Sequence, residues 1–458
     1  MSVNPADSAI FGGLFGTDEM REIFADRRYL QRMLDVEAAL ARVEAKLGII
    51  PAAAAQAITA AASIERLNLG EVAASVPVVG YPVVAVAKAL GRAAGGDAQR
   101  YVHWGATTQD ILDTAIVLQI RDGLARIEQG LIAIGGALAE KAGVHRDTVM
   151  AGRTHLQHAL PVTFGYKCAV WLAPLLDHLE RMRELRRRVL TVQFAGAVGT
   201  LASLAERGRA VTEGLAAELE LAAPLAPWHV NRERFAETAC FLGLLCGSLA
   251  KIATDVILLM QTEIGEANEP HQPGRGGSST MPQKRNPIAS EYVLAAARGV
   301  HALVPLMLNA MAQDQERATG PWQSEQLALP QIFVLTDGAL AHATALARGL
   351  TVDAEKMRRN LDATQGLIMA EAFMMRLAEK IGRDEAHHAV QEACGKALEE
   401  HRSLVDILAE APEIASQLDR AALDRIADPA SYLGEARSVA DRVIERARAM
   451  IGERMPGP

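Results

Sequence analysis

Apolar side chains recur at alternating spacings of three and four residues over several long stretches of the chain. The longest such stretch includes Val117, Leu124, Leu131 and Leu138. This spacing places one apolar stripe along a helix, the pattern of a helix that packs in a bundle. Similar patterns cover residues 172–182, 245–259, 293–311 and 331–350. The chain is therefore expected to contain a bundle of long helices.

The domain organisation follows from where these long patterns begin and end. Apolar residues also flank each stripe, so the helices are expected to bury more than one face and to pack against other subunits. We expect an all-α fold with three helical domains, namely residues 1–111, a central long-helix bundle over 112–350, and 351–458, which opens with an N-cap at Asp353. Residues 76–90 contain two prolines and are expected to form an irregular loop that leads into a helix.

Composition narrows the class of protein. The 458 residues can bury a large core, and the net charge of -8 argues against a nucleic-acid partner. The four cysteines have no paired spacing, so neither a disulfide framework nor a metal site is predicted. No uncharged stretch approaches the roughly 18 residues of a membrane span, and no signal sequence is evident. We expect a cytoplasmic protein with no membrane partner and no cofactor.

Three polar segments interrupt this apolar chain. The first island, residues 101–110, places Thr107, Thr108 and Asp110 before the first long helix. Hydroxyl and amide donors at a helix start favour a bound carboxylate, but the same residue types can also act only as helix caps. Function and simple capping therefore both remain open for this island.

The second island, residues 152–158, contains His155, a residue type that exchanges protons near neutral pH but is also common in structural positions.

The third island, residues 274–287, combines glycines with Lys284 and Asn286. Glycines let backbone amides approach an oxyanion, Lys284 adds a positive charge, and Asn286 can donate to a carboxylate or cap the next helix. Pro287 suits the first helical position. A flexible surface loop would explain the glycines but not the ordered run of Ser, Lys and Asn.

The run GSSTMPQKRNP at residues 277–287, preceded by the other two islands in this order, resembles the signature of the fumarase/aspartase superfamily. That superfamily includes fumarases, aspartases, argininosuccinate and adenylosuccinate lyases, and 3-carboxy-cis,cis-muconate cycloisomerases. The resemblance spans essentially the whole chain. It implies a homotetramer built around a 20-helix core, active sites that are each shared between three subunits, and chemistry that needs no metal.

The resemblance also implies roles for individual residues. Ser278 corresponds to the catalytic base, whose alkoxide Lys284 and the loop amides would stabilise. His155 corresponds to the general acid, and Glu291 to the carboxylate that orients it. Further positions are expected to contact a small polycarboxylate substrate, and these are Thr107, Thr108, Gln157, Ser279, Asn286 and Arg317.

Within the superfamily, residues 20–45, 100–114 and 357–372 are most similar to bacterial 3-carboxymuconate cycloisomerases, which add a carboxylate oxygen across a double bond to form a lactone. His155 and Glu291 depart from this pattern, because those enzymes often carry Trp at the first position and can lack the second carboxylate. Adenylosuccinate lyase is disfavoured, because Gly320 and Gln326 stand where it has phosphate-binding Ser and Arg.

Two alternative functions also fit the sequence. A C-N lyase or an epimerase of N-substituted aspartates, such as iminodisuccinate, would use the same proton abstraction and would need the general acid His155. An inactive structural helical tetramer is the alternative from another class, and it predicts degraded islands. Because all three islands keep their chemically active residues, the sequence favours an enzyme.

Overall fold

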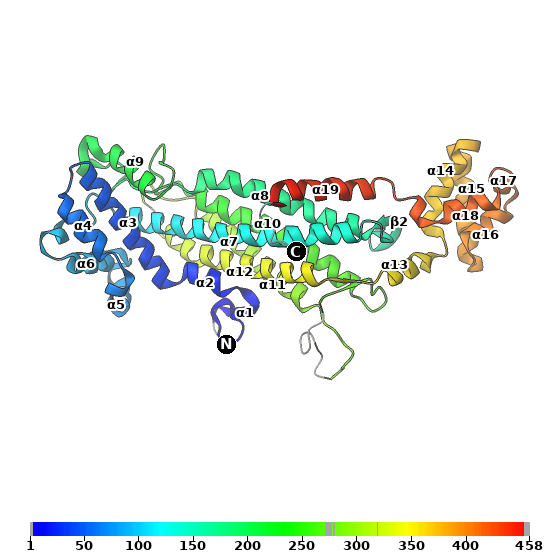
Figure 1. Ribbon diagram of the computed structural model, residues 1–458, viewed down its shortest axis with the longest axis horizontal. Coiled ribbons are helices and arrows are strands. Elements are labelled where there is room, and N and C mark those ends of the chain that lie inside the picture. The colour runs from blue at the N-terminus through cyan, green and yellow to red at the C-terminus, as the bar shows by residue number, and fades with distance from the viewer. Residues whose placement is uncertain (1–2, 271–276, 278–279, 318, 453–458) are drawn as a thin grey trace. The chain divides into compact units, whose positions relative to one another are not determined.

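The computed structural model describes residues 3–270, 277, 280–317 and 319–452 (Figure 1). The chain forms two compact units, each assembled from three segments. Unit 1 consists of Met1–Gly130, His178–Leu249 and Tyr292–Ala341, and unit 2 consists of Leu131–Asp177, Ala250–Glu291 and His342–Pro458. The three-domain division at residues 111 and 350 stays a prediction.

All of the long apolar patterns lie in long helices, as predicted. These helices are α7 (Thr108–Val144), α8 (Phe164–Val189), α10 (Glu233–Leu259), α11 (Ile288–Asn309) and α12 (Pro321–Gly349). The stripe on α7 is buried along its whole length, from Val117 to Leu138. The boundaries between the two units fall within these five helices.

Close contacts join segments of the long helices within unit 1. Gly123 of α7 lies against Phe333 of α12, where an added Cβ would meet the ring at 2.8 Å. His301 of α11 contacts the carbonyl oxygen of Gly243 in α10 at 2.9 Å. The absence of a side chain at these glycines lets the neighbouring helix approach closely. Small residues in the stripes therefore set the helix spacing in unit 1.

The rest of unit 1 consists of shorter helices (Figure 1). Most of them share with the start of α7 an apolar core that includes Met33, Leu40 and Leu90. The helices are α1 (Gly12–Phe15), α2 (Asp18–Phe24), α3 (Asp26–Lys46), α4 (Ala52–Ala61), α5 (Leu69–Val79), α6 (Val83–Ala94) and α9 (Gly208–Glu218). The expected loop leading into a helix at residues 76–90 is confirmed in part, because α6 begins at Val83, but residues 76–79 are helical, since α5 continues through Pro77. Only a short turn at residues 80–82 separates them.

Unit 2 contains a second helical group, packed around a core that includes Phe373, Leu377 and Leu408. Its helices are α13 (Ala354–Leu361), α14 (Ala370–Ile381), α15 (Arg383–Glu400), α16 (Leu404–Glu410), α17 (Pro412–Ala415) and α18 (Arg420–Ala427). The last helix, α19 (Ala436–Ile451), lies along α8 instead, where Arg446 pairs with Asp177 at 2.9 Å (Figure 1). The predicted N-cap is confirmed, because the Asp353 carboxylate accepts a hydrogen bond of 2.8 Å from the backbone N–H of Lys356.

The all-α expectation needs one correction, because unit 2 contains two small antiparallel sheets. Strands β1 (Val149–Thr154) and β2 (Gln157–Thr163) form a hairpin, and β3 (Ala267–Asn268) pairs with β4 (Thr351–Val352). Gly152, Pro161 and the β-branched pair Val162–Thr163 disfavour a helix in the hairpin. The fold is mostly helical, and the second island forms this hairpin.

Two helices, α10 and α11, are long and apolar enough by length and composition to cross a membrane. In their most apolar windows 50% and 28% of the residues are buried, respectively. The core helix of a soluble protein meets the same criterion. The other residues of α11 are intermediate or exposed on a single chain.

Candidate active site

The first island is held in place by one buried carboxylate. Asp110 accepts hydrogen bonds from the backbone N–H groups of Thr107 at 2.9 Å, Ala195 at 3.0 Å and Gly196 at 2.9 Å. Its other contact is the Nε2 atom of His229 at 2.7 Å. Asp110 has no exposed surface, so all of these contacts are shielded from water. The carboxylate thus fixes the start of α7 against the chain at residues 195–196.

Two of the predicted substrate-binding residues lie together at this point. The Arg317 Nη1 atom donates a hydrogen bond of 3.0 Å to the Thr107 hydroxyl, and Nη2 donates one of 2.9 Å to the Ala197 carbonyl oxygen. The Arg317 Nε atom is buried and has no partner among the described residues. Thr108 is the first residue of α7. A guanidinium beside a helix N-terminus is a favourable setting for a carboxylate.

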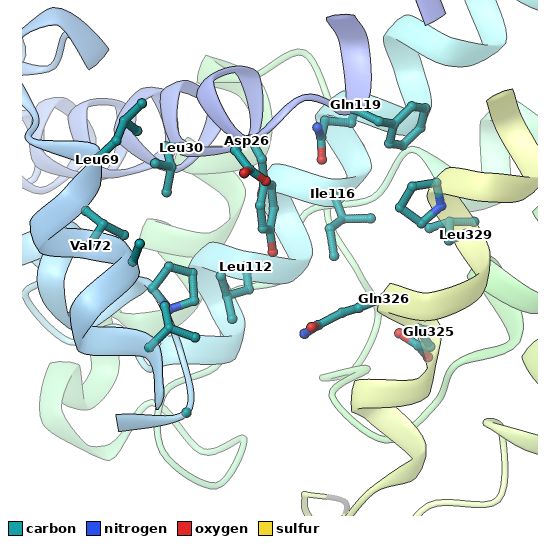
Figure 2. Close-up of a pocket in the computed structure, with 17 residues that line it drawn as sticks. Asp26, Leu30, Leu69, Val72, Leu112, Ile116, Gln119, Glu325, Gln326 and Leu329 are labelled. Carbon is teal, nitrogen blue, oxygen red and sulfur yellow. The ribbon is translucent and has the colours of Figure 1, made fainter. Parts of the chain in front are cut away.

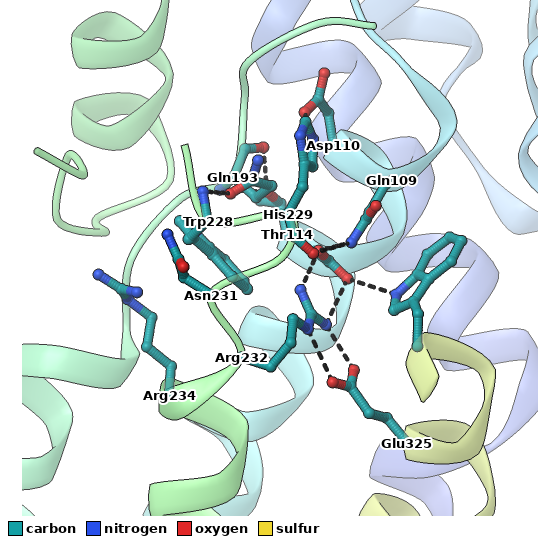
Figure 3. Close-up of polar contacts among 12 residues, drawn as sticks. Gln109, Asp110, Thr114, Gln193, Trp228, His229, Asn231, Arg232, Arg234 and Glu325 are labelled. Carbon is teal, nitrogen blue, oxygen red and sulfur yellow. Dashed lines mark hydrogen bonds and ion pairs between the residues drawn. The ribbon is translucent and has the colours of Figure 1, made fainter. Parts of the chain in front are cut away.

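A buried network of ion pairs and hydrogen bonds lies next to the first island. Arg232 forms two hydrogen bonds to Asp113, at 2.6 and 3.1 Å, and two to Glu325, at 2.8 and 2.6 Å. Gln109 and Trp322 also donate to Asp113, at 3.1 and 3.2 Å. Figure 3 shows Arg232 lying between Glu325 of α12 and the residues of α7. Burial raises the pKa of Glu325, although the Arg232 charge opposes that rise.

The sequence alone did not predict this network. Its only signal was the presence of Asp110 and Asp113 within an otherwise apolar stretch at the start of α7. Charged residues are rarely fully buried unless they are paired, so such positions predict partners but do not identify them. The partners Arg232 and Glu325 lie more than 90 residues away along the chain.

In unit 2, His155 lies at the tip of the β1–β2 hairpin. Thr154 pairs with Gln157, so His155 and Leu156 form a two-residue turn, with φ of 51° and 63°. Positive φ at both positions suits such turns, but it usually selects Asn or Gly and is strained for other residues. His155 and Gln157 are both exposed. The hairpin therefore displays the predicted acid at its tip at some cost in backbone energy.

A second ion pair, in which the carboxylate is buried, anchors this hairpin. Arg153 donates two hydrogen bonds to Glu266, at 2.9 and 2.6 Å. The Asn360 amide donates to the same carboxylate at 2.7 Å and to the carbonyl oxygen of Ile264 at 2.8 Å. Glu266 has no exposed surface. The strand that leads to His155 is thus tied to residues 264–266 and to α13, a connection that the sequence did not predict.

The third island is described only in part. Ser278 and Ser279, predicted as base and substrate contact, lie outside the described residues, as do Gly274 and Gly276. Gly277 forms an isolated antiparallel bridge with Arg285. Lys284 is exposed, and its backbone N–H donates to the Met281 carbonyl oxygen at 3.1 Å.

The first turn of α11 is capped by Glu269, a residue that precedes the third island in the sequence. The Glu269 carboxylate accepts hydrogen bonds from the backbone N–H groups of Ala289 at 3.0 Å and Ser290 at 2.8 Å, and from the Ser290 hydroxyl at 2.7 Å. Pro287 immediately precedes the helix, one position earlier than predicted. Asn286 is half-buried, and Glu291 is exposed in the first turn.

The described candidate residues fall into two groups. Unit 1 holds Thr107, Thr108 and Arg317, while unit 2 holds His155, Gln157, Lys284, Asn286 and Glu291. Among the residues that the structure describes, no cluster of three or more His, Cys, Asp or Glu is arranged to hold a metal ion. The individual roles of the candidate residues remain predictions.

Comparison with known proteins places the chain in a family. A family model described as lyase matches residues 15–301, and one for the adenylosuccinate lyase C-terminus matches residues 366–443. The 3-carboxy-cis,cis-muconate cycloisomerase of Pseudomonas aeruginosa is 48% identical over 98% of each chain. Trans-aconitate decarboxylase 1 of Mycosarcoma maydis is 45% identical over 96% of this chain and 90% of that protein.

A solved structure agrees with these matches. The 3-carboxy-cis,cis-muconate lactonizing enzyme from Pseudomonas putida superposes with a TM-score of 0.92, at 46% identity, over 97% of this chain and 100% of that one. The chain is about equally identical to a cycloisomerase and to a decarboxylase. These matches therefore show the enzyme family but do not decide which reaction the protein catalyses. The chain therefore belongs to the fumarase/aspartase superfamily, the fumarate lyases.

Proposed function

We propose that this protein is an enzyme similar to 3-carboxymuconate cycloisomerase, which moves a proton beside a carboxylate and adds or eliminates a group on a small polycarboxylate. The observation that carries the proposal is the pairing of Arg317 with Thr107 at the start of α7, at 3.0 Å. A cation, a hydroxyl and a helix N-terminus together favour a bound carboxylate. The near-full-length similarity to cycloisomerases favours lactone formation over other reactions of the family.

In the proposed reaction, a carboxylate oxygen of the substrate forms a bond to one alkene carbon, and the adjacent carbon takes up a proton. The Ser278 hydroxyl delivers that proton, and in the reverse direction its alkoxide removes it. Charge builds on the carboxylate beside the reacting carbon as an enediolate. Lys284, Asn286 and the glycine-rich amides stabilise this charge, and Lys284 also stabilises the Ser278 alkoxide.

We further propose a cytoplasmic homotetramer that needs no cofactor, with each active site shared between three subunits. Several large apolar side chains remain exposed on a single chain, including Leu244 (59%), Leu308 (46%) and Met311 (39%) on or beside α10 and α11. Exposed apolar surface of this kind is typical of subunit interfaces. Pairing of these faces between subunits accounts for the low burial of α11.

The proposal is tested by incubating the purified protein separately with 3-carboxy-cis,cis-muconate, N-substituted aspartates, and fumarate with amines. Loss of the diene absorbance, with a lactone as the product by NMR, is the expected result. An unchanged diene spectrum would remove cycloisomerisation from the proposal. No reaction with any of the three would favour the inactive structural tetramer.

A C-N lyase or epimerase of N-substituted aspartates is the second candidate, because His155 and Glu291 are both present. A carboxylate nucleophile within the substrate needs little general-acid help, whereas an amine leaving group needs a proton. His155→Trp should therefore leave most activity on muconate but remove most activity on an N-substituted aspartate. A large rate loss on muconate would contradict this assignment of His155.

A further inference from the structure

A hollow of about 460 Å³ opens in unit 1 between α3, α5, α7 and α12 (Figure 2). Leu30, Val72, Leu112, Ile116 and Leu329 form most of its apolar lining. Figure 2 shows Leu112 and Ile116 on α7 facing this space and Gln326 reaching into it from α12. This volume lies within the range of pockets that hold a small molecule or a large substituent. We call this hollow the chamber.

The polar groups in the chamber are neutral or acidic. Tyr29, Gln119 and Gln326 contribute neutral groups, Asp26 and Glu325 contribute carboxyls, and no Lys, Arg or His is among the described residues that line it. Burial, together with the nearby charge of Asp113, raises the pKa of Tyr29, so the phenol stays neutral. A carboxylate placed here would lose its hydration and meet no cation. The chamber therefore selects for an uncharged group.

Specific contacts build the wall of the chamber near its α5–α6 turn. The rings of Tyr81 and Trp322 stack with centroids 5.4 Å apart, and the Gln323 amide lies 3.5 Å from the Tyr81 hydroxyl. Gly80 and Pro82 on either side of Tyr81 line the chamber. These contacts fasten the turn to the start of α12, so the chamber is a defined feature of the fold.

The chamber and the carboxylate-binding pair share two helices. Thr107 and Arg317, in hydrogen-bond contact, lie just before α7 and α12 respectively. Leu112 follows Thr107 by five residues, which is about 7.5 Å along a helix. Glu325 lies in the second turn of α12. The chamber and the pair therefore lie along the same part of α7 and α12, and Glu325 belongs both to the chamber lining and to the buried network around Asp113.

We propose that the chamber is a subsite for an uncharged, mainly hydrocarbon substituent of a polycarboxylate that Thr107 and Arg317 hold. This inference rests on the proposed function, because it takes the polycarboxylate site as given. It extends that function to ligands bulkier than 3-carboxymuconate, whose substituents are all carboxylates. Within one charge class, the ligand with the larger hydrocarbon group binds more tightly.

Binding of three compounds to the full-length protein, measured by calorimetry, tests the proposal. These are succinate, 2-benzylsuccinate and 2-(4-carboxybenzyl)succinate. Burying the phenyl ring should make 2-benzylsuccinate bind at least about tenfold more tightly than succinate. The added carboxylate of the third compound should abolish that gain, because the chamber offers it no cation. Equal gains for both benzyl compounds would overturn the charge selection.

A variant that fills the chamber tests whether the benzyl group binds there. Ile116→Trp should reduce the benzyl gain to less than about threefold while succinate binds as in the wild type. Val78→Trp is the matched control, since Val78 lies on α5 but is 86% exposed and does not line the chamber. Circular dichroism and the molar mass in solution establish that both variants fold and assemble. A benzyl gain that survives Ile116→Trp in a folded protein would place the ring elsewhere and overturn the proposal.

The outcomes also separate this inference from the proposed function. Succinate binding without any benzyl gain would overturn the chamber subsite and leave the polycarboxylate proposal standing. Failure of all three compounds to bind would contradict the polycarboxylate site itself. In Arg317→Ala, succinate and 2-benzylsuccinate should weaken by the same factor. Undiminished binding of 2-benzylsuccinate there would show that its anchor is not the Thr107–Arg317 pair, and the chamber proposal would fail.

Discussion

Glu44 on α3 is a buried acid without a compensating partner. Its side chain has no exposed surface, and neither carboxylate oxygen has a hydrogen-bond partner among the described residues. Burial, with a smaller contribution from the charge of Glu37, raises its pKa to about 8. The folded protein therefore binds a proton at Glu44 that the unfolded chain releases at much lower pH.

This raised pKa predicts a pH-dependent effect of Glu44→Gln. The folded pKa lies above the unfolded value near 4.5, so the contribution of Glu44 is intact below pH 4.5 and declines as the pH rises toward about 8. The variant should gain stability relative to the wild type over this interval, on the order of 5 kcal/mol. Thermal unfolding midpoints between pH 5 and pH 9 measure it. A constant difference, like that expected for exposed Glu22→Gln, would contradict the raised pKa.

Arg317 is the residue on which substrate binding should depend most directly. Lysine keeps the charge but cannot contact both Thr107 and the Ala197 carbonyl oxygen in the geometry of the guanidinium. Arg317→Lys should therefore raise KM by about tenfold or more, with a smaller change in kcat. Steady-state kinetics on 3-carboxy-cis,cis-muconate, the proposed substrate, measure both constants. An unchanged KM would remove Arg317 from the binding site.

At the scale of elements, the β1–β2 hairpin is held by the Arg153–Glu266 pair and by Asn360. Glu266→Gln removes the charge partner of the half-buried Arg153, so it should destabilise unit 2 by about 1–3 kcal/mol. Because the strand leading to His155 loses its anchor, activity that needs the acid should fall as well. The matched control is Glu263→Gln, at an exposed position three residues earlier.

Thermal unfolding and kinetics are compared for the two variants. If Glu266→Gln behaved like Glu263→Gln in both, the ion pair would have no part in positioning the hairpin. Loss of stability with full activity on N-substituted aspartates would limit the pair to a structural role.

The sequence predicted the long helices well, because the three-and-four spacing on α7 or α10 directly records which face is buried. It predicted less of the candidate site. Thr107, Arg317 and His155 were identified from residue types and family resemblance, but the partners that hold them, such as Glu266, were not. Those contacts join residues separated by about a hundred positions or more, and no local pattern encodes them.

The hairpin was also missed, for a physical reason. Residues 149–163 lack a clear alternation of apolar and polar side chains, and the turn uses His155 and Leu156 in place of the usual Asn-Gly. Local preference and observed structure therefore conflict at this turn. Conflicts of this kind are expected where a side chain is displayed for function.

At the scale of the whole molecule, we expect a tetramer with shared active sites. Light scattering should give four times the 49.0 kDa mass of the chain. Leu244→Glu, which places a charge on an exposed apolar position of α10, should reduce this mass without unfolding the chain. A tetramer that tolerates this charge would exclude the surface around Leu244 from the interface.

Shared sites also predict that two inactive variants restore each other. Arg317→Ala and Lys284→Gln alter different groups of candidate residues, so mixed tetramers should contain some sites with neither change. Activity should return after the two variants are unfolded and refolded together, but not after simple mixing without subunit exchange. No recovery in demonstrably mixed tetramers would indicate that each site is built from one chain.

In the proposed mechanism, Ser278 moves a proton beside a substrate carboxylate. The most direct measurement is the turnover of 3-carboxy-cis,cis-muconate by the wild type and by Ser278→Ala, followed by the diene absorbance, with the molar mass of both proteins determined in parallel. We expect lactone formation by the wild type and a loss of at least about a thousandfold in kcat for a tetrameric Ser278→Ala. Turnover at the wild-type rate by Ser278→Ala would contradict this mechanism.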